Sequence, residues 1–247
     1  MNLVLDLGNS RCKWALAGAD LKPGSALAYG EDFSRTLDHA FGKLAQPVQV
    51  AAVSVAGAAL TDTLAHWVQR HWNLDLLRFG ARAAQCGVTN LYNDPAQLGA
   101  DRWAALIAAR GRVPGAACVV DCGTAVTVDA LDASGVFRGG VILPGLALTR
   151  AALLQRTQGV SAVEGDTGSV LAHTTADGVA AGTLFGLAGA IDRILDEQAA
   201  ALGASPQVLL TGGDAPAVQA LLRHTTHLMP DLVLEGVARM ASTEGAA

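Results

Sequence analysis

Two stretches decide the fold class: MNLVLDLGNSRCKW at residues 1–14 and ACVVDCGTAVTVD at residues 117–129. Each runs an apolar strand into an aspartate, one further residue, a glycine and then small polar residues. A second apolar run follows directly, so both stretches predict a strand, a tight turn and a returning strand. The recurrence of one pattern at two distant places indicates a duplicated unit.

The elements around the first stretch follow from hydrophobic periodicity and turn residues. The predicted order is three strands, a helix, a strand, a helix and a strand. These elements are expected at 2–7, 11–18, 25–30, 33–45, 48–55, 58–70 and 74–79.

The second stretch opens a similar series. Strands are expected at 117–121, 125–131 and 136–142, with the tight turn DASG at 132–135. A helix at 175–201, a strand at 207–211, a helix at 215–223, a strand-like region HLMPDLVL at 227–234 and a terminal helix complete it. Pro114 and Gly115 mark the break between the halves, 1–113 and 114–247. We therefore expect an α/β protein with two mixed sheets, whose two turns face one cleft.

The two turns have the chemistry of a phosphate site. Gly8 and Gly123 let phosphate oxygens approach backbone N–H groups, and Asn9, Ser10 and Thr124 add donors. Asp6 and Asp121 would repel a phosphate, so they are expected to hold a cation that bridges to it. Lys13 could neutralise phosphate charge. The alternative is that both are ordinary turns, in which Asp, Gly and Asn are common for conformational reasons.

Composition and charge exclude several classes of protein. The net charge is -5 and no Lys/Arg cluster occurs, so we expect no nucleic-acid partner. The four cysteines form no CxxC pair, which indicates reduced thiols and the cytoplasm. Asp6 and Asn9 interrupt the N-terminal apolar run, which does not fit a signal peptide. The uncharged run at 178–191 is shorter than the roughly 20 residues of a spanning helix, so no membrane association is expected.

Six motifs spread along the chain carry a resemblance to a known family. They are DLGNSRCKW (6–14), YNDPAQLGADRW (92–103), DCGTAVTVD (121–129), GGVILPG (139–145), TTADGVAAG (174–182) and TGGD (211–214). Together they resemble the type III pantothenate kinases, in the superfamily of acetate and sugar kinases, Hsp70 and actin. The resemblance implies two RNase H-like domains with an interdomain cleft. It also implies ATP-dependent phosphorylation of the primary hydroxyl of pantothenate, the first step toward coenzyme A.

The resemblance implies two sets of nucleotide and cation residues. The expected ATP contacts of the first turn are Asp6, Leu7, Gly8, Asn9, Ser10, Arg11, Cys12 and Lys13. Asp6 is also a candidate Mg²⁺ ligand. In the second turn, Thr124 is expected to contact ATP and Asp121 to hold a monovalent cation, K⁺ or NH₄⁺.

The resemblance places the acceptor substrate at the GADR motif. Tyr92, Gly99, Ala100, Asp101, Arg102 and Thr175 are the expected pantothenate contacts, and Asp101 is the expected base. From its position before the helical run RWAALIAARGR, Asp101 also fits a helix N-cap. The two roles can coexist. The guanidinium of Arg102 is planar and permanently charged, so it suits the carboxylate of pantothenate.

Gly178, Gly182, Gly186 and Gly189 fall close to one helix face. Such a stripe indicates another element packed very close, either within the chain or across a subunit interface. Because the resembled family is dimeric, we expect a homodimer with the helix near Thr175 beside its interface. Two other functions stay open, a non-catalytic nucleotide-binding regulator and a kinase for another small hydroxyl acceptor.

Overall fold

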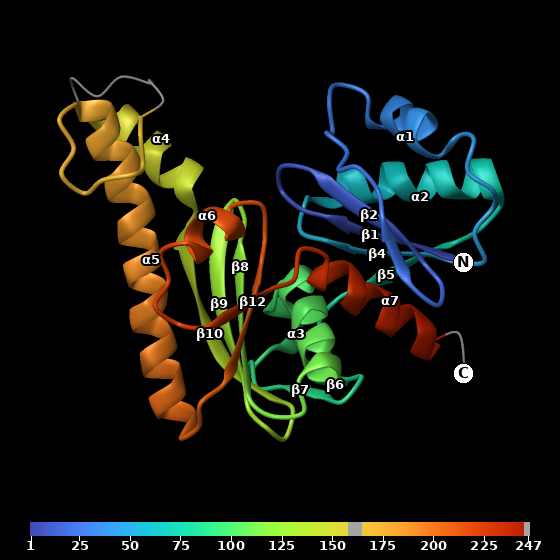
Figure 1. Cartoon of the computed structure of the whole chain (residues 1–247). Coiled ribbons are helices and arrows are strands. Elements are labelled where there is room, and N and C mark those ends of the chain that lie inside the picture. Colours follow the sequence, from blue (N-terminus) through green and yellow to red (C-terminus); the bar gives the residue numbers. More distant parts are fainter. Residues whose placement is uncertain (158–164, 245–247) are drawn as a thin grey trace. The chain divides into compact units, whose positions relative to one another are not determined.

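The protein is described here by a computed structural model that covers residues 1–157 and 165–244 (Figure 1). The chain forms two compact units. The first contains residues 1–112, 135–137 and the C-terminal segment from Asp231, and the second contains residues 113–134 and 138–230. Each unit is a mixed sheet with helices, which confirms the predicted α/β class.

The first unit is built on a five-stranded sheet in the order β3-β2-β1-β4-β5. Its strands are β1 (Asn2–Leu7), β2 (Cys12–Ala17), β3 (Leu21–Pro23), β4 (Val50–Ser54) and β5 (Leu76–Phe79). Strands β1, β2 and β3 form an antiparallel meander, and β4 and β5 add in parallel to β1.

Helices cover both faces of this sheet (Figure 1). On one face Leu3, Leu5 and Leu7 pack against α1 (Phe33–Phe41) and α2 (Ala58–Trp72). The other face meets α3 (Ala100–Arg112) and α7 (Leu232–Glu244). Gly236 allows α7 to approach α3 closely, because a Cβ there would lie 1.9 Å from the carbonyl oxygen of Ala104. Side chains alternate between the two faces of a strand, and Leu5 and Leu7 lie on the first face. The side chain of Asp6, between them, therefore lies on the second face.

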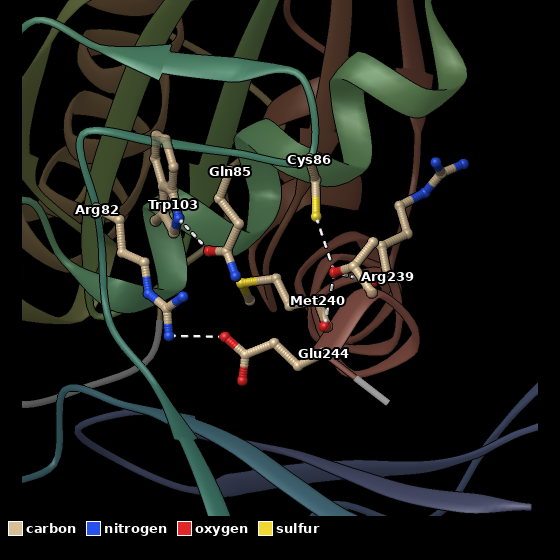
Figure 2. Close-up of polar contacts among 8 residues, drawn as sticks. Arg82, Gln85, Cys86, Trp103, Arg239, Met240 and Glu244 are labelled. Carbon is tan, nitrogen blue, oxygen red and sulfur yellow. Dashed lines mark hydrogen bonds and ion pairs between the residues drawn. The ribbon is translucent and has the colours of Figure 1, made fainter. Parts of the chain in front are cut away.

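A short hairpin lies beside α3 and precedes the candidate site in the chain. It consists of β6 (Ala84–Gln85) and β7 (Val88–Asn90), and the 3₁₀ turn Pro95–Gln97 follows it. Figure 2 shows three contacts that attach this hairpin and its approach to α3 and α7: Trp103 Nε1 to Gln85 Oε1 (3.0 Å), Cys86 Sγ to Thr243 Oγ1 (3.5 Å) and Arg82 to Glu244 (2.7 Å). The hairpin is thus held at a fixed position against the helix that carries the GADR motif.

The second unit contains strands in the order β12-β11-β8-β9-β10. The strands are β8 (Ala117–Cys122), β9 (Ala125–Leu131), β10 (Val136–Pro144), β11 (Gln207–Thr211) and β12 (Thr226–Leu228). The first two residues of β10 belong to the first unit. Its helices are α4 (Leu146–Arg156), α5 (Thr175–Leu202) and α6 (Ala215–Gln219). Val120, Val128 and Leu210 of the sheet pack with Leu184 and Ile191 of α5 in one core.

Several predicted elements differ from the structure. The third strand is at 21–23 instead of 25–30, because the chain turns at Gly24 over the Trp14 ring and Leu27 only forms an isolated bridge with Cys12. The helix predicted at 33–45 ends at Phe41, and the one predicted at 215–223 ends at Gln219. The region 227–234 divides between a strand and the start of α7, because Pro230 cannot continue the ladder.

The expected halves also differ from the compact units. The first boundary lies near residue 113, but residues 135–137 and the segment from Asp231 pack with the first unit. Helix α7 returns there because its apolar face, with Val233, Val237 and Met240, is buried against α3 and β1.

Among the described residues, α5 is the one helix long and apolar enough to span a membrane by length and composition. Its buried residues, including Leu184, Ile191 and Leu195, lie in the core of the second unit. This packing accounts for the apolar composition of one side of α5.

Candidate active site

The first turn joins β1 to β2 and brings the predicted phosphate-site residues together. Gly8 N donates to Arg11 O (3.2 Å) and closes the turn, and Asn9, Ser10 and Arg11 are exposed along it. Asp6 lies directly opposite Lys13 in the antiparallel ladder, so the two side chains share a face of the sheet. Asp6 is only 8% exposed. The turn thus combines a buried carboxylate, a cation and exposed polar groups.

Two of the predicted ATP contacts, Leu7 and Cys12, have side chains in the core. Both are 0% exposed and pack in the cluster between the sheet and α1 and α2. Burial and the charge of Asp6 raise the pKa of the Cys12 thiol far above its usual range, so the thiol stays protonated. Any contact of these two residues with ATP must therefore use the backbone.

Tyr29 supports the first turn and was not predicted. Its hydroxyl donates a hydrogen bond to the carbonyl oxygen of Gly8. Burial, then the nearby Cys12 and Asp6, raise the pKa of Tyr29 well above its usual value, so the hydroxyl remains a donor. No local pattern could identify this residue, because it lies 21 positions from Gly8 in the sequence.

The GADR corner lies where the chain enters α3. The helix begins at Ala100, and Trp103 N donates to Gly99 O (3.0 Å). Asp101 is therefore inside the first turn and is not the N-cap that its sequence context favoured. It still satisfies a first-turn donor, since its Oδ1 accepts from Arg102 N (2.7 Å). A Cβ at position 99 would lie 2.6 Å from Asp101 Oδ1, so a larger residue there would displace this carboxylate.

The electrostatics of Asp101 differ from those of a surface carboxylate. Burial raises the pKa of Asp101 above its ordinary value, and the hydrogen bond from Arg102 N and the Arg102 charge offset this only in part. A carboxylate with a raised pKa is a better proton acceptor than an exposed one. A carboxylate in this setting can serve as a general base.

Arg102 and Tyr92 lie side by side. Arg102 is 7% exposed, its Nη1 donates to the Tyr92 hydroxyl (3.2 Å), and its guanidinium lies 6.0 Å from the centre of the Tyr92 ring. The Tyr92 backbone N–H donates to Asn90 Oδ1 (3.0 Å), and Asn90 Nδ2 donates to Pro95 O (3.2 Å). Asn90 is buried and was not predicted, yet it fixes the loop that carries Tyr92.

The second turn joins β8 to β9 and is crowded by two glycine segments. Gly123 N donates to Ala125 O (3.1 Å), and Asp121 lies opposite Thr127. A Cβ at Gly212 would lie 2.4 Å from the Cys122 carbonyl and 2.6 Å from Asp121 Oδ1. A Cβ at Gly145 would lie 2.4 Å from Gly123 O. Glycines of the GGVILPG and TGGD motifs therefore approach the DCGT turn closely.

Helix α4 starts at this turn. Gly145 is its N-cap without a side-chain cap bond, and Gly145 N donates to Thr124 O (3.1 Å). The first N–H groups of a helix have no partner within it, and the helix dipole favours an anion there. This end of an 11-residue helix therefore lies beside Thr124, the predicted ATP contact.

Thr175 is the first residue of α5, in the second unit. It is exposed, and the preceding Thr174 caps the helix by accepting from Asp177 N (3.1 Å). Gly178 N donates to Thr174 O (2.9 Å), so the helix is regular at this glycine. Thr175 lies at one end of a groove of about 590 Å³ between α4 and α5.

The glycine stripe of α5 lines this groove. Gly178, Gly182 and Gly186 belong to its wall, together with apolar Leu143 and Leu153. Among the described residues, no atom lies within 4 Å of a Cβ built at Gly182, Gly186 or Gly189. Close packing against residues 1–157 and 165–244 thus does not explain the glycines at 182, 186 and 189.

Within residues 1–157 and 165–244, no group of three or more His, Cys, Asp or Glu side chains could hold a metal ion. Asp6 and Asp121 each bring a carboxylate to the end of a strand. That donor set suits Mg²⁺ bound by one carboxylate, waters and phosphate oxygens, because Mg²⁺ dehydrates reluctantly and is seldom held by protein ligands alone.

Comparisons with known proteins identify the family of the chain. A family model described as type III pantothenate kinase matches residues 2–197. The type III pantothenate kinase of Alkalilimnicola ehrlichii is 41% identical over 245 residues, covering 98% of each chain. That of Nitrosococcus oceani is 39% identical over 249 residues, covering 98% of this chain and 94% of its own.

A solved structure gives the fold. The activator of 2-hydroxyisocaproyl-CoA dehydratase from Clostridium difficile, with bound ADPNP, matches with a TM-score of 0.57 at 13% identity. The match covers 99% of this chain and 96% of that one. At this identity the likeness shows the fold alone. The family match and the full-length relatives show more: the chain belongs to the type III pantothenate kinase family.

Proposed function

We propose that this protein transfers the γ-phosphoryl group of ATP to the primary hydroxyl of pantothenate. The observation that supports this most is the GADR corner, where a half-buried carboxylate with a raised pKa adjoins an arginine held by a tyrosine. A hydroxyl acceptor with a carboxylate needs this pair of functions, a base for one end and a cation for the other.

In the proposed reaction Asp101 is the general base. The pantothenate hydroxyl donates a hydrogen bond to the Asp101 carboxylate, and its oxygen attacks the γ-phosphorus in line with the leaving ADP oxygen. A new O–P bond forms, the β–γ bridging P–O bond breaks, and the hydroxyl proton passes to Asp101. Because phosphoryl transfer proceeds through a loose transition state, orientation of the hydroxyl contributes more than early removal of its proton.

The acceptor is held by groups around this base. Arg102 binds the pantothenate carboxylate, with Tyr92 fixing the guanidinium. Gly99 and Ala100 shape the backbone beside the hydroxyl, and Thr175 is a distal contact. Gly99 leaves the space that Asp101 occupies.

The two turns hold the nucleotide. The stretch 6–13 binds ATP phosphates through backbone N–H groups, with Lys13 as the positive side chain. Asp6 would hold Mg²⁺, which neutralises phosphate charge when bound. Thr124 and the N-terminus of α4 bind ATP at the second turn, and Asp121 would hold K⁺ or NH₄⁺ there.

A second copy of this chain is proposed to cover the α4–α5 groove. Val141, Ile142, Leu148 and Leu153 on β10 and α4 are exposed, beside the glycine stripe. Large exposed apolar patches mark interaction surfaces, and glycines permit close approach of a helix. Gly186→Glu is expected to yield monomers in sedimentation, and an unchanged mass would place the interface elsewhere.

We also place the protein in the cytoplasm, without nucleic-acid or membrane partners. All four cysteines are free, and Cys12, Cys118 and Cys122 are buried. Buried free thiols are typical of reducing compartments.

A coupled ATPase assay with Mg²⁺ over a panel of hydroxyl acceptors tests the proposal. We expect turnover with pantothenate, higher with K⁺ or NH₄⁺ than with Na⁺. Turnover with another hydroxyl compound alone would favour a different kinase. Nucleotide binding without transfer to any acceptor would favour a regulator.

A further inference from the structure

We propose that Phe137 is a positioning residue for substrate binding: its ring holds the Arg102 guanidinium in the orientation that recognises the acceptor's carboxylate. This inference rests on the proposed role of Arg102. Phe137 comes from β10, far from the GADR motif in the sequence, and its own side chain carries no polar group.

The rings of Phe137 and Tyr92 both lie beside Arg102. The guanidinium carbon lies 5.9 Å from the centre of the Phe137 ring and 6.0 Å from that of Tyr92. The two ring centres are 5.6 Å apart, with their planes tilted by 36°. These distances fall within the range of cation–π and aromatic pairs. The guanidinium is therefore held by an aromatic pair, in addition to the hydrogen bond to the Tyr92 hydroxyl.

Phe137 is itself rigidly held. It is 0% exposed, and it pairs with Asn90 in the parallel ladder of β10 and β7. Two residues earlier, Gly135 has a φ of +90° and its carbonyl accepts from Thr89 N (2.9 Å). A Cβ at Gly135 would lie 2.3 Å from Gly87 O, so position 135 accommodates only glycine. The entry to β10 thus fixes Phe137 beside the buried Asn90.

Asn90 therefore connects Phe137 and Tyr92, two residues that hold the Arg102 guanidinium. Asn90, the ladder partner of Phe137, accepts from Tyr92 N and donates to Pro95 O. Tyr92 in turn accepts from Arg102. Loss of the Phe137 ring frees one side of the guanidinium and loosens Tyr92. A tilted guanidinium loses the alignment that a bidentate contact with a carboxylate requires.

The ring also keeps the contact dry. Arg102 is 7% exposed, and an ion pair is much stronger in a site from which water is excluded. Phenylalanine cannot compete for the guanidinium N–H groups, because its ring carries no acceptor oxygen. Its role is thus to orient the cation and exclude water, and not to bind substrate.

The test compares pantothenate with its primary amide, in which a neutral group replaces the carboxylate. The ratio of kcat/KM for the two acceptors measures carboxylate recognition. Phe137→Met fills similar volume without a ring, and Phe137→Leu is a second variant in case one fails to fold. Phe41→Leu is the matched control, because Phe41 is also 0% exposed in the first unit but packs with Trp14, Trp67 and Trp72. Arg102→Gln tests the proposed function in the same panel.

We expect Phe137→Met to raise the KM for pantothenate about tenfold and to lower the acceptor ratio by a similar factor. The KM for ATP and the turnover of the amide should stay within about twofold. Phe41→Leu should lower the melting temperature without changing the ratio.

The outcomes separate the two hypotheses. If Arg102→Gln lowers the ratio and neither Phe137 variant does, the positioning role is wrong and the Arg102 role stands. If Arg102→Gln leaves the ratio unchanged, the proposed role of Arg102 fails, and the Phe137 inference fails with it. An equal fall of the ratio in Phe41→Leu would show a general effect of destabilisation and would also overturn the inference.

Discussion

Asp101→Asn is the substitution that isolates the proposed base. The amide keeps the size of the side chain, and its oxygen can still accept from Arg102 N at the 2.7 Å position. Only the proton-accepting charge is removed. General-base catalysis contributes roughly 10²- to 10⁴-fold, so we expect kcat to fall within that range while the KM for pantothenate changes less than about threefold.

The effect of the same substitution on stability has a definite sign. Burial raises the pKa of Asp101 in the folded state above its unfolded value. Such an acid stabilises the fold below the unfolded pKa, and that contribution is lost as pH rises through the folded pKa. At neutral pH the ionised carboxylate is thus unfavourable to the fold. Asp101→Asn should therefore melt at the same or a higher temperature than the wild type.

The pH dependence of activity should also report the ionisation of Asp101. The base must be ionised, so kcat/KM falls as pH drops through the raised pKa of Asp101, and this acid limb disappears in Asp101→Asn. Asp94→Asn is the matched control, since Asp94 lies on the preceding loop and caps the 3₁₀ turn through Ala96 N (3.1 Å). It should keep turnover within about threefold. Unchanged turnover in Asp101→Asn, measured by steady-state kinetics, would refute the base assignment.

Three further predictions concern the supporting residues. Tyr29→Phe removes the hydrogen bond to Gly8 O, which should cost about 1 kcal/mol of stability and raise the KM for ATP several-fold, with little change for pantothenate. Gly212→Ala places a Cβ 2.4 Å from the Cys122 carbonyl at a φ of +98°, so it should cost about 2 kcal/mol or more in thermal unfolding and weaken ATP binding. Gly115→Ala, where a Cβ meets open space in the same unit, is its control and should change neither. Gly99→Ala displaces Asp101 Oδ1 and should lower kcat more than it lowers the melting temperature, whereas equal losses would indicate a folding defect.

The sequence predicted the parts of the site that are local in the chain. Asp6, Gly8 and Lys13 come together through one hairpin, and Asp101 and Arg102 through one helical turn, so their proximity follows from short-range geometry. The turn Asp121–Thr124 was predicted for the same reason. Hydrophobic periodicity likewise placed most strands and helices within a few residues.

Supports from distant segments could not be predicted in this way. Tyr29 reaches Gly8 across a loop, and Phe137 on strand β10 reaches Arg102 on helix α3. Gly145 and Gly212 permit close approach to the second turn because they lack a side chain. Only the folded backbone shows which atoms a Cβ at these positions would contact. Helix α7 packs on the first unit because its buried face fits α3, a choice that no local pattern encodes.

The central claim is transfer of the γ-phosphoryl group to pantothenate through the GADR corner. Its most direct test is to incubate the purified protein with γ-labelled ATP, Mg²⁺, K⁺ and pantothenate, and to identify the labelled product by mass spectrometry. We predict label on the primary hydroxyl of pantothenate with the wild type, and at least about a hundredfold less with Asp101→Asn. Absence of labelled phosphopantothenate with the folded wild-type protein would contradict the account.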